Sequence, residues 1–132
     1  MISPNPQEWI VLIVDDEPDN LRVAQRVLLH QGSTVYAAEN GQEGLAVVAQ
    51  VRPNFILLDL SMPKMDGWEM FRRLRAEPST ADIPVIALTA HAMEDDRQRA
   101  TEAGFDGYIT KPFRLVSFLE DIRAALQPFI TP

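Results

Sequence analysis

The sequence predicts an open, doubly wound α/β domain with a five-stranded parallel sheet and five helices. Short runs rich in Val, Ile and Leu alternate along the chain with longer segments whose apolar residues recur at helical spacing. The strongest runs show no alternation of apolar and polar residues, which is typical of strands that a parallel sheet buries on both faces. Strands and helices that alternate in this way, joined by short right-handed crossovers, form a single layered domain.

Four strong strands and one weaker strand are expected. Each strong run stops directly at a polar residue, so the carboxyl end of each strand is well marked in the sequence. The strong runs are residues 9–14, 55–58, 84–88 and 107–110, and the weaker strand is expected at residues 34–38.

The helices are expected between and after these strands. Pro18 suits the first turn of the first helix, where its missing N–H has no partner, and Gly32 suits the end of that helix. The fourth helix is mostly polar, whereas the last carries apolar residues three and four positions apart on one face. The second to fifth helices are expected, in order, at residues 41–50, after residue 67, at 93–103 and at 115–126.

Length, composition and charge narrow the classes of function. The 132 residues suffice for one domain with a hydrophobic core, predicted at residues 9–128 between tails at 1–8 and 129–132. A net charge of -7 disfavours direct contacts with nucleic acid or an anionic membrane surface. No cysteine is present, and no apolar run is long enough to span a bilayer. We therefore expect a soluble, cytoplasmic protein that binds neither nucleic acid nor membranes directly.

The chemistry is expected at the carboxyl ends of the strands. In a doubly wound sheet, sites form at that edge, where the strand order reverses. Asp15 and Asp16 follow the first strand and Asp59 follows the third, while Thr89 and Lys111 follow the fourth and fifth. The sheet itself should therefore bring these polar side chains together.

The first turn is acidic, which indicates a cation site. Nucleotide-binding domains of similar architecture place a glycine-rich, anion-binding loop here, but this turn reads Asp15-Asp16-Glu17-Pro18. Clustered carboxylates repel one another unless a proton or cation lies between them, and oxygen ligands without His or Cys favour Mg²⁺ or a similar ion such as Mn²⁺.

A phosphoryl group is the ligand that such a site suits. Lys111 and Thr89 could bind phosphoryl oxygens on the side away from the metal, because phosphoryl transfer depends mainly on positioning and charge neutralisation. A carboxylate can act as a nucleophile and form an acyl phosphate. Asp59 is the best candidate for this role, since it stands alone at the end of a central strand.

Taken in order, these residues resemble the receiver domains of two-component response regulators, in particular the stand-alone chemotaxis and cell-cycle regulators. The resemblance extends from Ile10 to Leu126 and implies the flavodoxin-like receiver topology. It rests on motifs that each follow the expected strand: Asp15-Asp16, Asp59 within Leu58-Asp59-Leu60-Ser61-Met62-Pro63, Asp66-Gly67, Thr89-Ala90, Tyr108 before Thr110, and Lys111-Pro112-Phe113.

The resemblance implies a role for each site residue. Asp59 is expected to be the phosphoacceptor, and Asp16, Asp59 and the backbone carbonyl of Ser61 the direct metal ligands. Asp15 is expected to act on the metal through water.

The same resemblance implies a phosphoryl-binding and switching group. Lys111 is expected to bind the phosphoryl group, and Thr89, with Ala90 beside it, to move towards it. Tyr108 is expected to turn inward when Thr89 moves, although it could also be an ordinary strand aromatic.

Two further features follow from the resemblance. Ser61 and His91 are expected to flank the path of the attacking water and so to influence hydrolysis. The peptide bond between Lys111 and Pro112 is expected to be cis.

The implied function is that of a phosphorylated switch rather than a turnover enzyme, with at most slow removal of its own phosphoryl group. The donor would be a histidine kinase or a histidine phosphotransfer protein. The downstream protein target would bind the face formed by the fourth helix, fifth strand and fifth helix.

Two other classes compete with this interpretation. A haloacid-dehalogenase-type phosphatase needs a second aspartate two residues after its nucleophile, and that position holds Ser61. A flavodoxin-like cofactor carrier is disfavoured by the acidic first turn.

Overall fold

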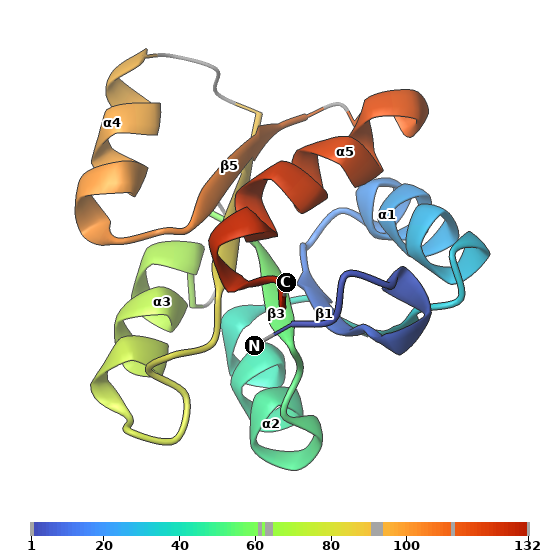
Figure 1. Ribbon diagram of the computed structural model, residues 1–132. Coiled ribbons are helices and arrows are strands. Elements are labelled where there is room, and N and C mark those ends of the chain that lie inside the picture. The colour runs from blue at the N-terminus through green and yellow to red at the C-terminus, as the bar shows by residue number, and fades with distance from the viewer. Residues whose placement is uncertain (1, 61, 63–64, 91–93, 112, 132) are drawn as a thin grey trace.

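The centre of the molecule is a twisted parallel sheet flanked by helices on both faces (Figure 1). The computed structural model describes residues 2–60, 62, 65–90, 94–111 and 113–131. Within these residues five strands form one sheet in the order β2-β1-β3-β4-β5, with every neighbouring pair parallel. The strands are β1 (Ile10–Val14), β2 (Thr34–Ala38), β3 (Phe55–Asp59), β4 (Val85–Thr89) and β5 (Gly107–Thr110). The predicted doubly wound α/β fold is confirmed.

Helices separate the strands as the sequence indicates. The described α-helices are α1 (Pro18–His30), α2 (Gly41–Val51), α3 (Gly67–Ala76), α4 (Glu94–Ala103) and α5 (Leu115–Leu126), with short 3-10 helices η1 (Pro6–Glu8) and η2 (Gln127–Phe129) near the termini. Pro18 occupies the first turn of α1, and Gly32 follows its end with a φ of 87°, where glycine carries no Cβ penalty. The expected start of α4 at residue 93 lies outside the described residues.

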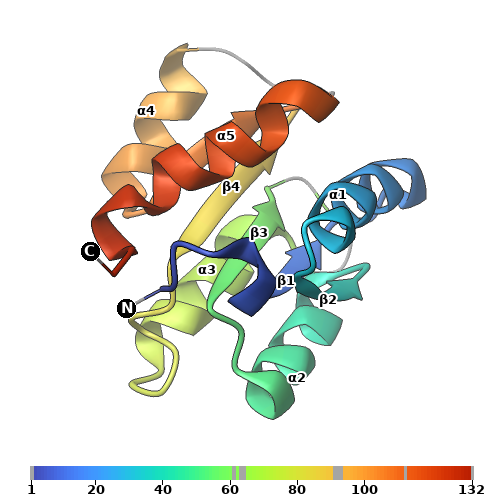
Figure 2. The same cartoon turned by 45° about the vertical axis from the view of Figure 1, so that its right-hand side comes forward.

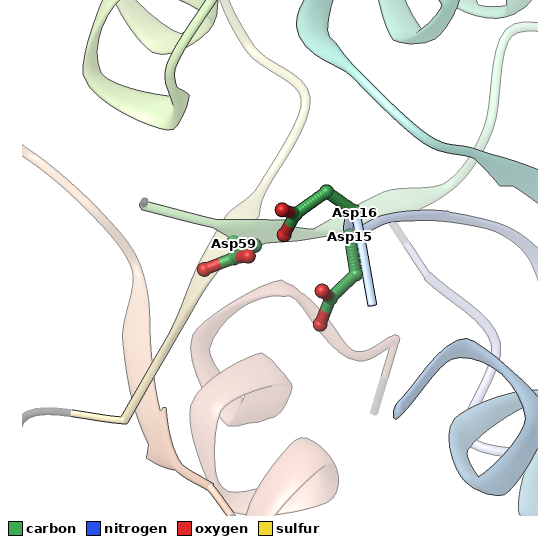
Figure 3. Close-up of side chains that lie close together, drawn as sticks. All are labelled: Asp15, Asp16 and Asp59. Carbon is green, nitrogen blue, oxygen red and sulfur yellow. The ribbon is translucent and has the colours of Figure 1, made fainter. Parts of the chain in front are cut away.

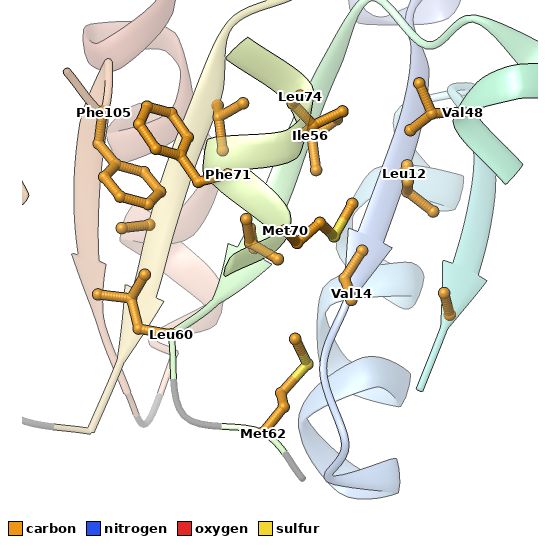
Figure 4. Close-up of a cluster of buried hydrophobic side chains, with 14 of the residues drawn as sticks. Leu12, Val14, Val48, Ile56, Leu60, Met62, Met70, Phe71, Leu74 and Phe105 are labelled. Atoms are coloured by element: carbon orange, nitrogen blue, oxygen red, sulfur yellow. The ribbon is translucent and has the colours of Figure 1, made fainter. Parts of the chain in front are cut away.

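Alternate strand residues supply two separate cores, one on each face of the sheet. Leu12 and Val14 of β1 point to the face covered by α2 and α3, where Met70, Phe71 and Leu74 pack (Figure 4). The neighbours of these strand residues, including Val11 and Ile13, point to the opposite face, where α1 and α5 lie side by side (Figure 2). This explains why the strand sequences are apolar throughout.

The strand order reverses at β1. From β1 the chain crosses to β2 at one edge, and then returns past β1 to β3, β4 and β5 on the other side. The helices that make these two crossovers, α1 and α2, lie on opposite faces of the sheet, so their starts diverge at the carboxyl ends of β1 and β3, where sheets of this kind form their sites. This edge of the sheet is where the sequence places its acidic residues.

The terminal segments are packed against the domain rather than extending away from it. Ile2 pairs in parallel with Ile130, its N–H donating to the carbonyl of Phe129 at 2.7 Å, and Ile2 itself is buried. The indole N–H of Trp9 donates to the carbonyl of Ser3 at 2.7 Å. The segments expected to be tails are therefore held by burial and hydrogen bonds, and both ends of the chain meet (Figure 1).

Candidate functional site

Three aspartates meet at the carboxyl ends of β1 and β3 (Figure 3). Asp15 and Asp16 follow β1 directly, and Asp59 is the last residue of β3. One carboxylate oxygen from each lies within 4.8 Å of the other two. Asp15 and Asp59 are buried, with 0% and 3% of their surfaces exposed, whereas Asp16 is open to solvent. Two acids are thus removed from water at the bottom of the site, and a third stands at its mouth.

Lys111 places a positive charge among these carboxylates. Its ammonium nitrogen Nζ lies 2.8 Å from Asp15 Oδ2 and 3.2 Å from Asp59 Oδ2. The side chain starts just beyond β5 and reaches over the end of β4, and the N–H of Lys111 donates to the carbonyl of Thr89 at 2.7 Å. That backbone bond fixes the base of the long side chain, so its head is aimed at the two buried acids.

The electrostatics of Lys111 reflect a balance between burial and neighbouring charge. Burial acts to lower the pKa of Lys111, because it penalises the charged form. The contact with Asp15 and the negative charges of Asp15 and Asp59 outweigh this and raise the pKa above its ordinary value. Lys111 is therefore a permanent cation at neutral pH.

The turn after β1 holds Asp15 rigidly. The N–H of Asp15 donates to the carbonyl of Ala38 at 3.0 Å, which extends the pairing of β1 with β2 by one residue. The N–H of Glu17 then donates to Asp15 Oδ1 at 3.0 Å. One carboxylate oxygen of Asp15 thus organises the turn into α1, while the other faces Lys111.

The turn after β3 depends on Gly67, whose role the sequence did not reveal. Asp66 caps α3 by accepting a hydrogen bond from the N–H of Glu69 at 2.9 Å. The next residue, Gly67, lies so close to the backbone of Asp59 that a Cβ atom there would clash with the Asp59 carbonyl oxygen. A glycine in the first turn of a helix, where it has no conformational advantage, is the sequence signal that could have indicated this contact.

Thr89 and Tyr108 lie on neighbouring strands beside the acidic site. Thr89 is the buried last residue of β4, paired in register with Thr110 of β5. Tyr108 is half-buried two residues earlier on β5, and the guanidinium of Arg97 from α4 lies 5.1 Å from the centre of its ring. Ala90 is exposed directly after β4. The expected switch pair is thus placed between the carboxylates and α4.

Three further expectations fall outside the residues that the structure describes. They concern the backbone carbonyl of Ser61 as a metal ligand, the part of Ser61 and His91 in hydrolysis, and the cis bond before Pro112. They remain predictions.

The donor set fits a hard divalent cation. Asp15 Oδ2 is buried and accepts no well-aligned hydrogen bond from the described residues, although the Lys111 ammonium is within ion-pair distance. The cluster offers carboxylate oxygens only, as Mg²⁺ prefers, and Asp16 is open to solvent, as suits an ion that keeps several waters.

Sequence comparison identifies the class of protein. The family model of the response regulator receiver domain matches residues 11–123. The chain belongs to this family, and the resemblance seen in the sequence is confirmed.

Several relatives and solved structures are similar over most of this chain. An uncharacterised 14.6 kDa protein of Leptolyngbya boryana is 41% identical, across 89% of this chain and 87% of that protein. The DNA-binding dual master transcriptional regulator RpaA of Synechocystis is 39% identical across 89% of this chain. The high-resolution structure of the chemotaxis response regulator CheY4 of Vibrio cholerae superimposes with a TM-score of 0.83 at 28% identity, covering 89% of this chain and 98% of that one.

The relatives differ in length from this chain. It spans only 48% of RpaA and 51% of the phosphate regulon regulator PhoB of Pseudomonas aeruginosa, but nearly all of CheY4. The same domain thus occurs in longer proteins and as an almost complete chain. Among the described helices, none combines the length and apolar character needed to cross a membrane.

Proposed function

We propose that this protein is a phosphorylated signalling switch in which Asp59 accepts a phosphoryl group from a histidine kinase or a histidine phosphotransfer protein. Asp15, Asp16 and Asp59 would hold Mg²⁺ or Mn²⁺. Lys111 and Thr89 would bind the phosphoryl oxygens. The domain would act by binding a protein partner rather than by turning over a substrate, with slow loss of its own phosphoryl group, and would work in the cytoplasm.

The bridging position of Lys111 is the observation that carries this proposal. Its ammonium lies within 3.2 Å of both Asp15 and Asp59, which are buried, whereas Asp16 beside them is open to solvent. A cation in that position lowers the repulsion between the buried acids. It also offers its charge to any anionic group that becomes attached to Asp59.

Each residue has a distinct task in the transfer. An Asp59 carboxylate oxygen attacks phosphorus, the bond between phosphorus and the donor nitrogen breaks, and the leaving imidazole keeps that electron pair. The bound divalent cation would neutralise charge on the transferring group. Lys111 would exchange part of its contact with Asp59 for the phosphoryl oxygens, and Asp15 would hold the lysine in place.

The switch would pass from Thr89 to Tyr108 and then to α4. A phosphoryl group adds about 1.5 to 2 negative charges and three acceptor oxygens beside the end of β4. Thr89, as the hydroxyl at that end, would turn towards it, and Tyr108 would follow into the space vacated. Because Arg97 covers the Tyr108 ring, the movement would be felt by α4 first. The surface of α4, β5 and α5 is the proposed contact for the downstream partner.

Intact-mass measurement after treatment with acetyl phosphate tests the phosphoryl transfer directly. With Mg²⁺ present, the protein should gain one phosphoryl group that hydroxylamine removes, as expected for an acyl phosphate. Asp59→Asn should gain none, and chelation of the metal should prevent the gain in the unmodified chain. The matched control is Asp121→Asn, which changes an exposed carboxylate of α5 and should be phosphorylated normally. Equal labelling of the Asp59→Asn protein would refute the proposal.

A further inference from the structure

The turn that joins α4 to β5 is held by hydrogen bonds of Asp106. Its N–H donates to the carbonyl of Val85 at 2.8 Å, and the N–H of Val85 donates back to Asp106 Oδ2 at 2.9 Å. The backbone and the carboxylate of Asp106 therefore both bind the first residue of β4. This contact lies next to the first registered pair of β4 and β5, which joins Ile86 to Gly107.

Arg75, in the last turn of α3, joins that helix to the same contact. Its Nη2 donates to Asp106 Oδ2 at 3.0 Å, and its Nη1 donates to the carbonyl of Ile83 at 2.8 Å. The planar guanidinium thus holds two acceptors in a fixed geometry, and it lies over the Phe71 ring at 4.7 Å. The hydrogen bonds among Arg75, Ile83, Val85 and Asp106 are called the clamp below.

Phe105, which directly precedes Asp106, adds a buried contact to the clamp. Its ring stacks on Phe71 of α3 with centres 3.9 Å apart, and Trp68 meets it edge-on with centres 5.4 Å apart (Figure 4). Its N–H donates to the carbonyl of Ala100 at 3.0 Å, which closes the last turn of α4. The residues that follow α4 are therefore fastened to both α3 and β4.

The described part of α4 itself is attached more weakly. Ala100 is the one buried residue at positions 97–103. Arg97 and Arg99 lie over the rings of Tyr108 and Trp68 at 5.1 and 4.9 Å. Contacts of this kind at exposed positions are weak compared with the burial of a large ring. The helix is therefore held more firmly at its carboxyl end than along residues 97–100.

Gly104 lies between α4 and the fastened residues. Its φ of 103° is in the left-handed region, which glycine occupies at little cost. Among the described atoms, a Cβ at this position would have only Phe71 within 4 Å, at 3.8 Å, so the packing leaves room here. Hinges are residues at the ends of elements that absorb changes in φ and ψ, and Gly104 has these properties.

We propose that α4 moves as a lever about Gly104, with its carboxyl end held by the clamp and by Phe105 while its amino end swings. An α-helix rises about 1.5 Å per residue, so residues 98 and 102 lie about 9 Å and about 3 Å from this pivot. A swing would displace residue 98 about three times as far as residue 102, whereas sliding of the whole helix would displace both equally.

The lever makes Arg75 a positioning residue for α4, although it belongs to α3. The pivot rests on the contacts of the clamp and of Phe105 alone. Its use by phosphorylation, which would act on the amino end of α4 beyond β4, rests on the proposed function.

Pairs of spin labels measure the lever, and each label needs one substitution because the chain has no cysteine. One label is placed at Gln50→Cys, an exposed position of α2, and the other at Gln98→Cys or Glu102→Cys on α4. Residues 98 and 102 share one face of the helix, and either substitution removes the same hydrogen bond between them, so the two labelled chains are matched. In the unphosphorylated chain, the distance distribution should be broader from residue 98 than from residue 102.

Release of the clamp should remove this difference. Arg75→Lys keeps the charge but loses the planar group that holds both acceptors, and Asp106→Asn keeps the shape but loses the negative charge. Either variant should broaden the distribution from residue 102 towards that from residue 98, and the second variant guards against a failure of the first to fold. Arg73→Lys, the same change at an exposed position of α3, is the matched control and should alter neither distribution.

Beryllofluoride with Mg²⁺, which imitates the phosphoryl group, tests the link to the acidic site. Its addition should shift the mean distance from residue 98 about three times as much as that from residue 102. Asp59→Asn should abolish both shifts. The absence of a shift at both positions would count against the proposed function, while the distributions in the unphosphorylated chain would still decide the pivot.

Three results would overturn the lever. Equal widths from residues 98 and 102 in the unphosphorylated chain would mean that the carboxyl end of α4 is not held more firmly. An unchanged width from residue 102 in both Arg75→Lys and Asp106→Asn would mean that the clamp does not hold it. Equal shifts at the two positions with beryllofluoride would mean that α4 slides rather than swings.

Discussion

The two helices that flank β5 are attached to the molecule in different ways. α5 buries Phe118, Ile122 and Leu126 against the sheet, each with at most 1% of its surface exposed. In the described part of α4, residues 97–103, Ala100 alone is buried, and the ring contacts of Arg97 and Arg99 provide the other attachments. Burial fixes a helix firmly, whereas arginine–ring contacts at exposed positions are worth only about 0.5–1 kcal/mol each. We therefore expect α4 to shift more readily than α5 when its surroundings change.

The largest loss of stability should come from removing a buried contact between α5 and the sheet. Phe118→Ala removes a fully buried ring that stacks on Phe113 with centres 4.7 Å apart, and it should cost about 3–5 kcal/mol of unfolding free energy. Urea denaturation should show a lower midpoint at unchanged slope. Arg123→Ala, an exposed change on the same helix, should shift the midpoint little. A loss below about 1 kcal/mol for Phe118→Ala would mean that α5 is no better anchored than α4.

Substitution of Lys111, which follows β5 between the two helices, should lower stability by an intermediate amount. Lys111→Met leaves Asp15 and Asp59 without their shared cation and should cost about 2 kcal/mol at neutral pH. Added Mg²⁺ should restore more stability to this variant than to the unmodified chain, because the variant has the greater uncompensated charge. Arg114→Met, which removes an exposed cation nearby, should show neither effect.

The difference in stability between the unmodified chain and Lys111→Met should depend on pH, because the pKa of Lys111 is raised in the folded state. A lysine whose pKa is higher in the folded state stabilises that state fully below its unfolded pKa of about 10.4. The stabilisation is lost as the pH rises through the folded pKa. The unmodified chain and Lys111→Met should therefore converge in stability above about pH 10.4, and a constant difference there would contradict this account.

The smallest effect on stability, and the most informative one for the switch, is expected for Arg97→Ala. Loss of its contact with Tyr108 should cost only about 0.5–1 kcal/mol. Amide exchange in α4 should nevertheless become faster, while exchange in α5 stays slow. Beryllofluoride with Mg²⁺, which imitates the phosphoryl group, should change exchange in α4 and β5 of the unmodified chain more than in the variant. An equal response of α4 and α5 would remove the distinction between them.

Most of the fold could be predicted from the sequence because its signals are local. Apolar runs that stop at Asp15, Asp59 and Thr89 mark three strand ends, and the alternation with helical segments leaves few topologies. The pairing of Ile2 with Ile130 could not be predicted, because it joins two residues at opposite ends of the chain through a single bridge. Neither segment carries a pattern of its own.

The sequence names candidate residues for the site, but it does not give their arrangement. The sequence places Asp15, Asp59 and Lys111 at one edge of the sheet, yet it does not say that Lys111 contacts both acids. The surroundings of Arg75 could not be predicted either. Arg75 is half-buried between Phe71 of its own helix and Asp106, which lies 31 residues further along the chain.

The meeting of the two termini has a practical consequence for the handling of this protein. Ile2 and Phe129 border the same hollow as Asn54 and Pro84, which directly precede β3 and β4. Both ends therefore emerge at the edge of the sheet where the strands begin, and the acidic cluster lies at the edge where they finish. A fluorescent reporter fused at either end, or a surface linkage through it, would leave the acidic cluster accessible.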